Sequence, residues 1–239
     1  MVLRFDAPQS SILGPLIFLI YVNDLPNSSS LLHFVLFADD TNVFLSDSSY
    51  HHIIGTLNEE LKHVSDWVKA NKLSLNVNKS NYILFASSQK LLPQDKEIIQ
   101  IDNILIPQVD AVKFLGIYID QHINWSVHIN LISAKAAKSI GIITRISSLI
   151  PKKILLNLYY SLVYPYLSYG NLVWASNYKS KLLRLHLLQK RIVRVVAKSP
   201  PCSHTHPLFL QLRILNISNC RIHASLYFQI ASYCLLELL

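Results

Sequence analysis

The 239-residue chain has few of the residues that mark disordered, disulfide-bonded or zinc-binding proteins. Only 5 residues are glycine and 15% are charged, while 51% are hydrophobic, so we expect a sizeable core and no long disordered segment. The cysteines, Cys202, Cys220 and Cys234, lie far apart without a Cys-x-x-Cys pair, which excludes a disulfide framework and a zinc knuckle and fits a reducing compartment. The segment from Cys202 to His206 lacks a second ligand pair at finger spacing, so a loop is favoured there over a metal cluster.

Long apolar runs and a leader peptide are missing as well. The first ten residues include the charged Arg4 and Asp6, so no signal peptide is expected there. The longest apolar runs, residues 12–22 and 224–239, are shorter than the roughly 20 residues that a membrane span needs. We therefore expect an intracellular protein, nuclear or cytoplasmic, that has no membrane partner, although its mean hydropathy of +0.31 is high for a soluble chain.

Acidic residues are almost absent from the second half of the chain. Residues 111–239 contain 15 Lys or Arg against 2 Asp or Glu, a net charge of +13. Residues 1–110 contain 7 against 12, a net charge of −5. This division predicts a part that binds a polyanion such as nucleic acid, joined to a metal-binding or structural part. Solubilisation of an apolar helical region is the alternative explanation.

The segment FVLFADDTNVFL, residues 34–45, places two adjacent carboxylates, Asp39 and Asp40, in the middle of an apolar run. The pattern predicts two buried strands joined by a turn over residues 39–42. Asp and Asn favour turns for local reasons, so a turn without chemistry is one explanation. The other is a divalent cation, because adjacent carboxylates repel each other and Mg²⁺ binds carboxylate oxygens while keeping waters or substrate phosphates as its other ligands.

The periodicity of the flanking sequence predicts a mixed α/β part. Apolar residues at steps of three and four predict an amphipathic helix over residues 53–70. Asp102-Asn103 is the expected turn between two of the strands that follow. The strand-like runs cover residues 82–85, 97–101, 104–106 and 112–119.

From Trp125 onward the pattern is helical. Pro151 is expected to open a second helix, and Pro165 to bend or split it. In a helix over residues 180–198, four cations fall within an arc of about 80° and could contact successive phosphates of one strand. A solvated helix face is the alternative. The four cations are Arg184, Arg191, Arg194 and Lys198.

Five sequence blocks occur in a fixed order: SILGPLIFLIYVNDL; FADDT; NKLSLNVNKSNYILF; KFLGIYID followed by NW and HI; and LLQKRIVRVV followed by HTHPLF. Together they strongly resemble the reverse transcriptases of non-LTR retrotransposons, the jockey-like and LINE-like group, over almost the whole chain. The resemblance implies an α+β fold. Residues 1–120 would form a partial polymerase palm, a small antiparallel sheet with packed helices that includes a primer-grip-like hairpin, and residues 121–239 a basic, mainly α-helical thumb-like or connection-like region.

The resemblance also implies a role for each matching residue. Asp39 and Asp40 look like the catalytic palm carboxylates that face two Mg²⁺ ions, and Lys79 looks like the lysine that approaches the outgoing phosphates. The partners would be an RNA template and a DNA primer, contacted along the backbone by the four cations of residues 180–198. The block against the incoming nucleotide and template matches Pro8, Gln9, Ser11 and Gly14, and the primer grip matches Lys113, Phe114, Leu115 and Gly116.

Two departures from the family pattern bear on activity. The leading block, usually G-V-P-Q-G-S, reads DAPQSS over residues 6–11, and the loss of both glycines removes backbone freedom and blocks close approach of a ligand. The family's third metal-binding aspartate and its fingers lie upstream of that block and are not among these 239 residues. We therefore expect an N-terminally truncated reverse transcriptase domain that is inactive alone. A non-catalytic nucleic-acid-binding module and a translated transposon relic are the alternatives.

Overall fold

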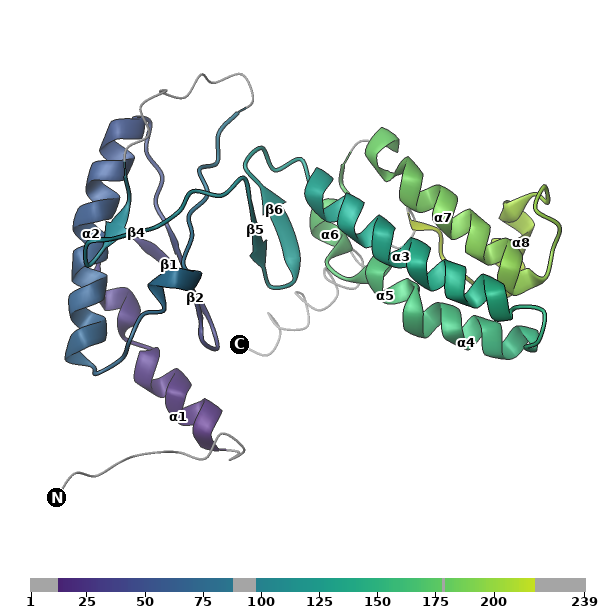
Figure 1. Cartoon of the computed structure of the whole chain (residues 1–239), viewed down its shortest axis with the longest axis horizontal. Coiled ribbons are helices and arrows are strands. Elements are labelled where there is room, and N and C mark those ends of the chain that lie inside the picture. The colour runs from purple at the N-terminus through teal and green to yellow at the C-terminus, as the bar shows by residue number, and fades with distance from the viewer. Residues whose placement is uncertain (1–12, 88–97, 178, 218–239) are drawn as a thin grey trace, which may run out of the picture. The chain divides into compact units, whose positions relative to one another are not determined.

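The computed structural model describes residues 13–87, 98–177 and 179–217, and the chain divides into two compact units, Met1–Val109 and Asp110–Leu239 (Figure 1). Helices and small antiparallel sheets occur together, which confirms the predicted α+β class. The first unit contains α1 (Leu13–Val22), η1 (Leu25–Ser28), β1 (His33–Phe37), β2 (Asp40–Phe44), α2 (Tyr50–Ala70), η2 (Val77–Lys79), β3 (Gln100–Ile101) and β4 (Ile104–Leu105). The second unit contains β5 (Ala111–Phe114), β6 (Ile117–Asp120), α3 (Ser126–Ile146), α4 (Lys152–Leu162), α5 (Tyr164–Ser168), α6 (Asn171–Trp174), α7 (Lys179–Ala197) and α8 (Thr205–Leu212).

The two aspartates lie at the tip of the antiparallel hairpin β1–β2, as predicted. Phe37 pairs with Asp40, so the loop is the two-residue segment Ala38–Asp39. The predicted four-residue turn over 39–42 is wrong in its extent, because the two residues after Asp40 pair in the ladder with β1. Ala38 takes the left-handed backbone conformation at φ +52°, a conformation that tight two-residue hairpin loops commonly require.

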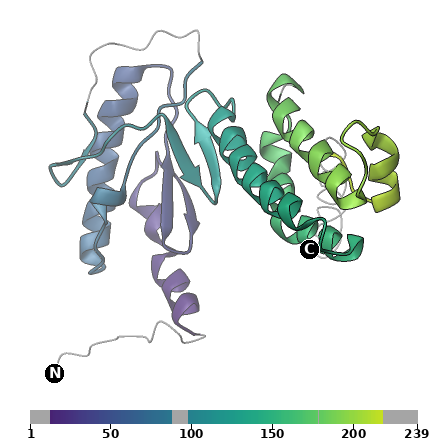
Figure 2. The ribbon, with the colours of Figure 1, turned by 45° about the vertical axis from the view of Figure 1, so that its right-hand side comes forward.

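Helix α2 covers one face of this hairpin (Figure 2), which confirms the predicted packing. The helix begins at Tyr50, three residues earlier than predicted, because the Ser49 side chain caps it by accepting from the His52 backbone N–H. The other face stays open, so the prediction that both strands are buried is wrong: Phe37 and Phe44 are 58% and 43% exposed. The packing residues are Val64 and Val68 of α2 with Phe34, Leu36 and Val43 of the hairpin.

The hairpin β3–β4 turns at Asp102-Asn103, as predicted. Both turn residues have positive φ, +52° and +63°, as a two-residue hairpin turn of the primed type requires. The Asp102 carboxylate accepts hydrogen bonds from Ser65 Oγ and, at 2.5 Å, from Lys69 Nζ. The bond from Lys69 is the main reason that the pKa of Asp102 lies below its usual range. The turn is therefore joined to α2 by charge-assisted hydrogen bonds.

The strand predicted over residues 82–85 is reduced to a single bridge. Tyr82 pairs with Gln108, through hydrogen bonds that join its backbone to Pro107 and Val109. Among the described residues no second bridge follows this one, so residues 83–85 do not form a ladder. Of the strand predicted over 97–101, only Gln100–Ile101 forms β3, and residue 97 lies outside the described residues.

The run predicted as one strand over 112–119 is instead the hairpin β5–β6. It turns at Leu115 and Gly116, whose φ values are +44° and +86°. Glycine adopts such a conformation without the steric penalty of a Cβ atom, which allows the chain to reverse there. This hairpin belongs to the second compact unit, together with the helices that follow it. The domain boundary that we predicted from the sequence lies after the hairpin, at residue 120.

The helices of the second unit follow the predicted breaks. Helix α4 begins directly after Pro151, and Pro165 stands in the first turn of α5, so the chain is split there. Helix α8 begins at Thr205, so the loop that we predicted over residues 202–206 ends before its last two residues. Because proline cannot donate a backbone hydrogen bond, it is tolerated at such helix starts and not in helix interiors.

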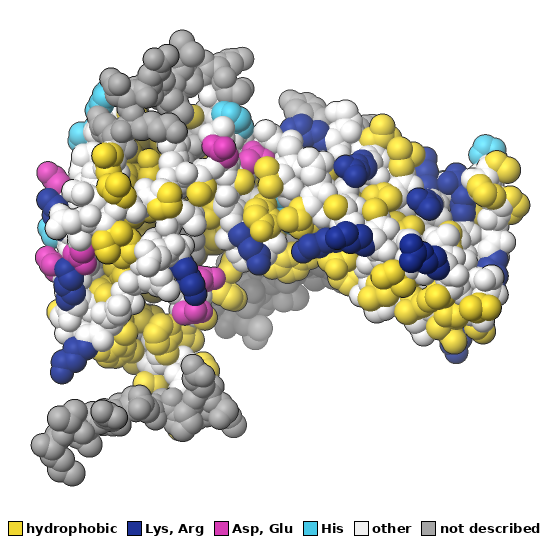
Figure 3. Space-filling model, viewed as in Figure 1, with side chains coloured by type: hydrophobic (Ala, Val, Ile, Leu, Met, Phe, Trp, Pro, Cys, Tyr) yellow, Lys and Arg dark blue, Asp and Glu magenta, His cyan; other side chains and the backbone are white. Residues whose placement is uncertain are grey.

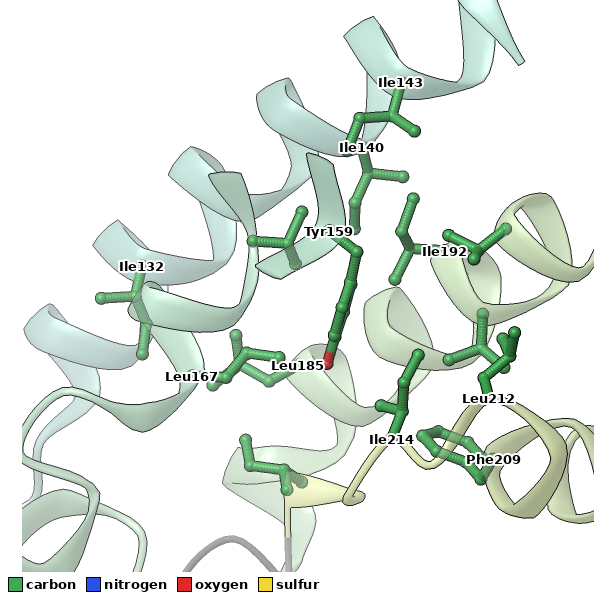
Figure 4. Packing of buried hydrophobic residues seen from close by; sticks show 14 of the residues in the cluster. Ile132, Ile140, Ile143, Tyr159, Leu167, Leu185, Ile192, Phe209, Leu212 and Ile214 are labelled. Atoms are coloured by element: carbon green, nitrogen blue, oxygen red, sulfur yellow. The ribbon is translucent and has the colours of Figure 1, made fainter. Parts of the chain in front are cut away.

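A single hydrophobic cluster fills the second unit. Ile140 of α3, Tyr159 of α4 and Ile192 of α7 are all fully buried and point toward one another (Figure 4). Burial at steps of three and four along α3 and α7 produces the two facing stripes. The hairpin β5–β6 joins this cluster through Ile117, so it is packed on a rigid core.

Helix α1 of the first unit is apolar but mostly exposed. All of its residues except Val22 are at least partly exposed, including Ile20 at 70%. Across the described ranges, no helix combines the length and the apolar character that crossing a membrane requires.

Candidate metal and nucleic-acid site

Asp39 and Asp40 project from the tip of β1–β2 with both side chains exposed. Among the described residues neither carboxylate has a hydrogen-bond or ion-pair partner, so their oxygens are available to a ligand. Ala38, next to them, is held in a left-handed conformation that costs a non-glycine residue about 1–2 kcal/mol.

The chemistry of the tip fits two of the ligands of a Mg²⁺ site. Mg²⁺ binds through one or two carboxylates and fills its other positions with waters and substrate phosphates. In the part of the chain that the structure describes, no group of three or more His, Cys, Asp or Glu side chains gathers that could hold a metal ion. The described residues thus bring two exposed carboxylates, Asp39 and Asp40, together at this tip.

The other residues assigned to catalysis and nucleotide binding are only partly placed. Lys79 is exposed at the end of η2, in the same unit as the hairpin, and makes no hydrogen bond or ion pair with either aspartate in the described structure. Gly14 is the second residue of α1. Pro8, Gln9 and Ser11 lie outside the described residues.

The hairpin β5–β6, which resembles a primer grip, has exposed residues on β5 and at its turn. Lys113 is exposed on β5 and pairs with Tyr118, while Phe114 pairs with Ile117 next to the turn. The turn residues Leu115 and Gly116 are exposed as well. The hairpin therefore exposes one cation and the backbone of its turn to a partner.

Three side chains that sequence reasoning missed hold this hairpin. The Tyr169 hydroxyl donates to the Leu115 carbonyl at 2.5 Å, and the Tyr118 N–H donates to His128 Nδ1 at 3.3 Å. At the base, the buried Asp120 carboxylate accepts from the backbone N–H groups of Asn124 and Ser126, at 2.8 and 3.1 Å. Asp120 stands five residues before Trp125, the N-cap of α3, so its role does not follow from the spacing of a capping residue. The first two contacts join residues 54 and 10 positions apart and have no local signature.

His128 is buried beside Trp174, with ring centroids 5.7 Å apart. Burial, and to a smaller extent the positive charge of Lys135, lowers the pKa of His128 below its usual value. Protonation would also put a hydrogen on the ring nitrogen that accepts from Tyr118. The fold therefore holds the neutral imidazole.

Because the folded pKa of His128 is depressed, stability should be lost as the pH falls. Below about pH 6.5 His128 is protonated in the unfolded chain and still neutral in the folded chain. The free energy of unfolding therefore decreases as the pH falls, until the pH passes the pKa of His128 in the folded chain. Urea denaturation between pH 7.5 and 5 should show this decrease. His186, whose pKa burial also lowers, contributes in the same direction.

The variant His128→Gln isolates the contribution of His128. Its pH dependence should be smaller than that of the unchanged chain, whereas His206→Gln, at an exposed histidine of α8, should leave it the same. An equal pH dependence in both variants would contradict the assignment.

The four cations that were predicted to form one row on α7 differ in their contacts and positions. Arg194 Nε donates to the Ser203 carbonyl at 2.9 Å, which ties the end of α7 to the segment before α8. Lys198 is exposed beyond the end of the helix at φ +55°. Arg184 and Arg191 are exposed and border a shallow groove of about 450 Å³ between α3 and α7. Three of the four cations thus remain open to a phosphate backbone.

Lys and Arg side chains spread over α3 and α7 on the face of the second unit that Figure 3 shows. The groove beside Arg184 has an apolar lining that includes Leu183 and Leu187, which are 53% and 54% exposed. The surface therefore combines positive charge with exposed aliphatic side chains. The contact of each predicted cation with nucleic acid stays a prediction.

Comparison with known proteins gives one family and several relatives. Residues 6–119 match the family model described as reverse transcriptase (RNA-dependent DNA polymerase). The chain is 27% identical over 198 residues to the probable RNA-directed DNA polymerase from transposon X-element of Drosophila melanogaster, covering 79% of this chain and 21% of that protein. It is 27% identical over 221 residues to the RNA-directed DNA polymerase from mobile element jockey of the same species, covering 87% and 23%. The jockey protein of Drosophila funebris is 22% identical over 225 residues, covering 89% and 24%.

The chain therefore spans about a quarter or less of the length of these curated relatives. No solved structure gave a significant match. The family match contains the hairpin β1–β2, Lys79 and most of β5–β6, while the helices from α3 onward lie beyond it.

Proposed function

We propose that this chain takes part in RNA-directed DNA synthesis. The proposal starts from residues 6–119, which match the reverse transcriptase family, and from the similarity of the chain to the RNA-directed DNA polymerase of the jockey element. In this proposal the tip of β1–β2 binds divalent metal ions, the hairpin β5–β6 contacts the primer strand, and the second unit holds the template–primer backbone. The observation that supports it most is the pair Asp39 and Asp40, exposed and without partners among the described residues, at the tip of a hairpin inside the matched segment.

Each group has a chemical task that its type can perform. When bound, the Mg²⁺ ions would lower the pKa of the primer hydroxyl and stabilise negative charge on the leaving pyrophosphate. Asp39 and Asp40 would hold these ions through carboxylate oxygens. Lys79, a flexible ammonium with three donors, would bind the outgoing phosphates and could supply a proton to them.

The exposed cations of the second unit favour a second candidate function, nucleic-acid binding without catalysis. Residues 111–239 carry a net charge of +13 and form a compact unit with its own core. Phosphate contacts supply most of the affinity of sequence-independent binding, so this unit could bind template and primer whether or not the metal site is complete.

Metal binding at the hairpin tip is the direct test. Mn²⁺ added to the purified chain should broaden the amide NMR signals of residues 38–41 before those of the rest of the first unit. The double variant Asp39→Asn and Asp40→Asn should remove this broadening. Asp66→Asn, at an exposed aspartate of α2, is the matched control and should leave it in place. Broadening that survives in the double variant would contradict the proposed metal site.

Primer extension separates the two candidate functions. Templated extension on a primed RNA with Mg²⁺ that disappears in Asp39→Asn would favour the polymerase. Salt-dependent binding without extension would favour the non-catalytic module.

A further inference from the structure

The tip of β5–β6 is held from outside the hairpin by Tyr169, on the connection between α5 and α6. Its hydroxyl donates to the Leu115 carbonyl at 2.5 Å. Its ring lies against Gly116, where a Cβ atom would stand 3.3 Å from Tyr169 Cε1. The Tyr169 side chain thus contacts both residues of the turn. Tyr169 is 57% exposed, so it is not a core residue, and its side chain contacts the turn through its hydroxyl and its ring.

The backbone of Tyr169 is itself fixed on the core. Its N–H donates to the Pro165 carbonyl at 3.0 Å, and its carbonyl accepts from Trp174 Nε1 at 2.9 Å. Trp174 is fully buried. At the next residue, Gly170, a Cβ atom would stand 2.3 Å from Ile117 Cδ1, so the connection passes close to the hairpin, and its φ of +59° is a conformation that favours glycine. The side chain that holds the tip is therefore mounted on a rigid part of the unit.

The turn needs such a partner because its conformation is unfavourable in isolation. Leu115 has φ +44°, a left-handed conformation that residues with a Cβ atom rarely adopt. The turn is also exposed, and the hairpin it closes has only two strands. Isolated two-stranded hairpins are marginally stable in water. Without the hydrogen bond from Tyr169, the Leu115–Gly116 backbone would sample other conformations.

We propose that Tyr169 is a positioning residue, which fixes the Leu115–Gly116 backbone in the conformation that contacts the primer strand. This inference rests on the proposed function, in which β5–β6 contacts the primer. Tyr169 touches neither primer nor reacting atoms in this proposal. It acts through the turn, because a partner that binds backbone groups requires those groups to be held in place before it arrives.

The test compares Tyr169→Phe with Tyr160→Phe in the full chain. Tyr160 is the matched control: it is 40% exposed, and its hydroxyl donates to the Arg213 carbonyl at 3.2 Å, in the same unit but away from the hairpin. Each variant removes one hydroxyl-to-carbonyl hydrogen bond. We measure amide hydrogen exchange of residues 114–118, the urea midpoint, and the affinity for an RNA–DNA hybrid with a recessed DNA 3′ end.

Tyr169→Phe should speed exchange at residues 114–118 and weaken binding of the recessed hybrid by about fivefold, the value of one hydrogen bond. Tyr160→Phe should do neither, while the two urea midpoints stay similar. Unchanged exchange and affinity in Tyr169→Phe would overturn the proposal, as would equal losses of affinity in both variants. In the unchanged chain, the hybrid should also protect residues 114–118 from exchange. If it does not, β5–β6 does not contact the primer. That result differs from one in which the hybrid protects the turn but Tyr169→Phe has no effect, which would contradict only the role of Tyr169.

Discussion

Replacing Gln189 with leucine is expected to lower the free energy of unfolding of the second unit by roughly 3 kcal/mol. Gln189 is 1% exposed, and its Nε2 donates to the Tyr159 hydroxyl at 3.1 Å and to the Leu215 carbonyl at 2.8 Å. Its Oε1 accepts from the Ile217 N–H at 2.9 Å. The variant removes all three hydrogen bonds, each worth about 1 kcal/mol, and leaves the buried Ile217 N–H without its Gln189 acceptor, while the added apolar surface recovers a part of the loss.

Urea denaturation together with amide exchange at residues 214–217 measures this effect. The matched control is Gln211→Leu, at an exposed glutamine of α8, which should change stability by no more than about 0.5 kcal/mol. Similar losses in the two variants would show that Gln189 does not hold the segment after α8 on the core.

Charge reversal at Arg184 and Arg191 is expected to weaken nucleic-acid binding at least about tenfold near 0.1 M salt. It should also reduce the slope of log affinity against log salt by about 1.4 to 1.8, because each lost phosphate contact removes about 0.7 to 0.9 from that slope. Both arginines are exposed and make no hydrogen bond or ion pair in the described part of the chain. Arg194 is left unchanged because its Nε binds the Ser203 carbonyl, so its reversal would disturb the fold as well.

The control reverses the same amount of charge in the first unit, with Lys62→Glu and Lys72→Glu at two exposed lysines. Binding to an RNA–DNA hybrid, measured at several salt concentrations, should respond more strongly to the arginine pair. Identical slopes for both double variants would mean that only net charge matters and that the arginines are a solvated helix face.

Local sequence patterns determined the elements that depend on neighbouring residues. The three- and four-residue steps of the apolar side chains located α2 and most of α7, and Pro165 located the break between α4 and α5. Asp102-Asn103 identified its turn because few residue types tolerate two successive positive φ values. The motif around Asp39 and Asp40 located the candidate metal-binding tip, since it combines a turn with an unusual pair of charges, and five sequence blocks in a fixed order, this motif among them, indicated the family.

Tertiary structure alone decided which of these elements have partners. The run at residues 82–85 has the composition of a strand, but a strand forms only where another backbone runs alongside it, and among the described residues only Tyr82 of this run forms a bridge, with Gln108. Phe37 and Phe44 are apolar, yet their burial depends on whether a second layer covers that face of the hairpin.

The contacts that hold the candidate sites in shape were also beyond local reasoning. Tyr169 meets Leu115 across 54 residues, and Gln189 meets Leu215 across 26. Periodicity shows which side of a helix faces inward, but it carries no information on which distant backbone group will lie within hydrogen-bonding distance of a side chain. The sequence by itself therefore determined where the carboxylates, the cations and the turns are, and the packing of the helices decided which side chains hold them, because those hydrogen bonds exist only after the core has closed.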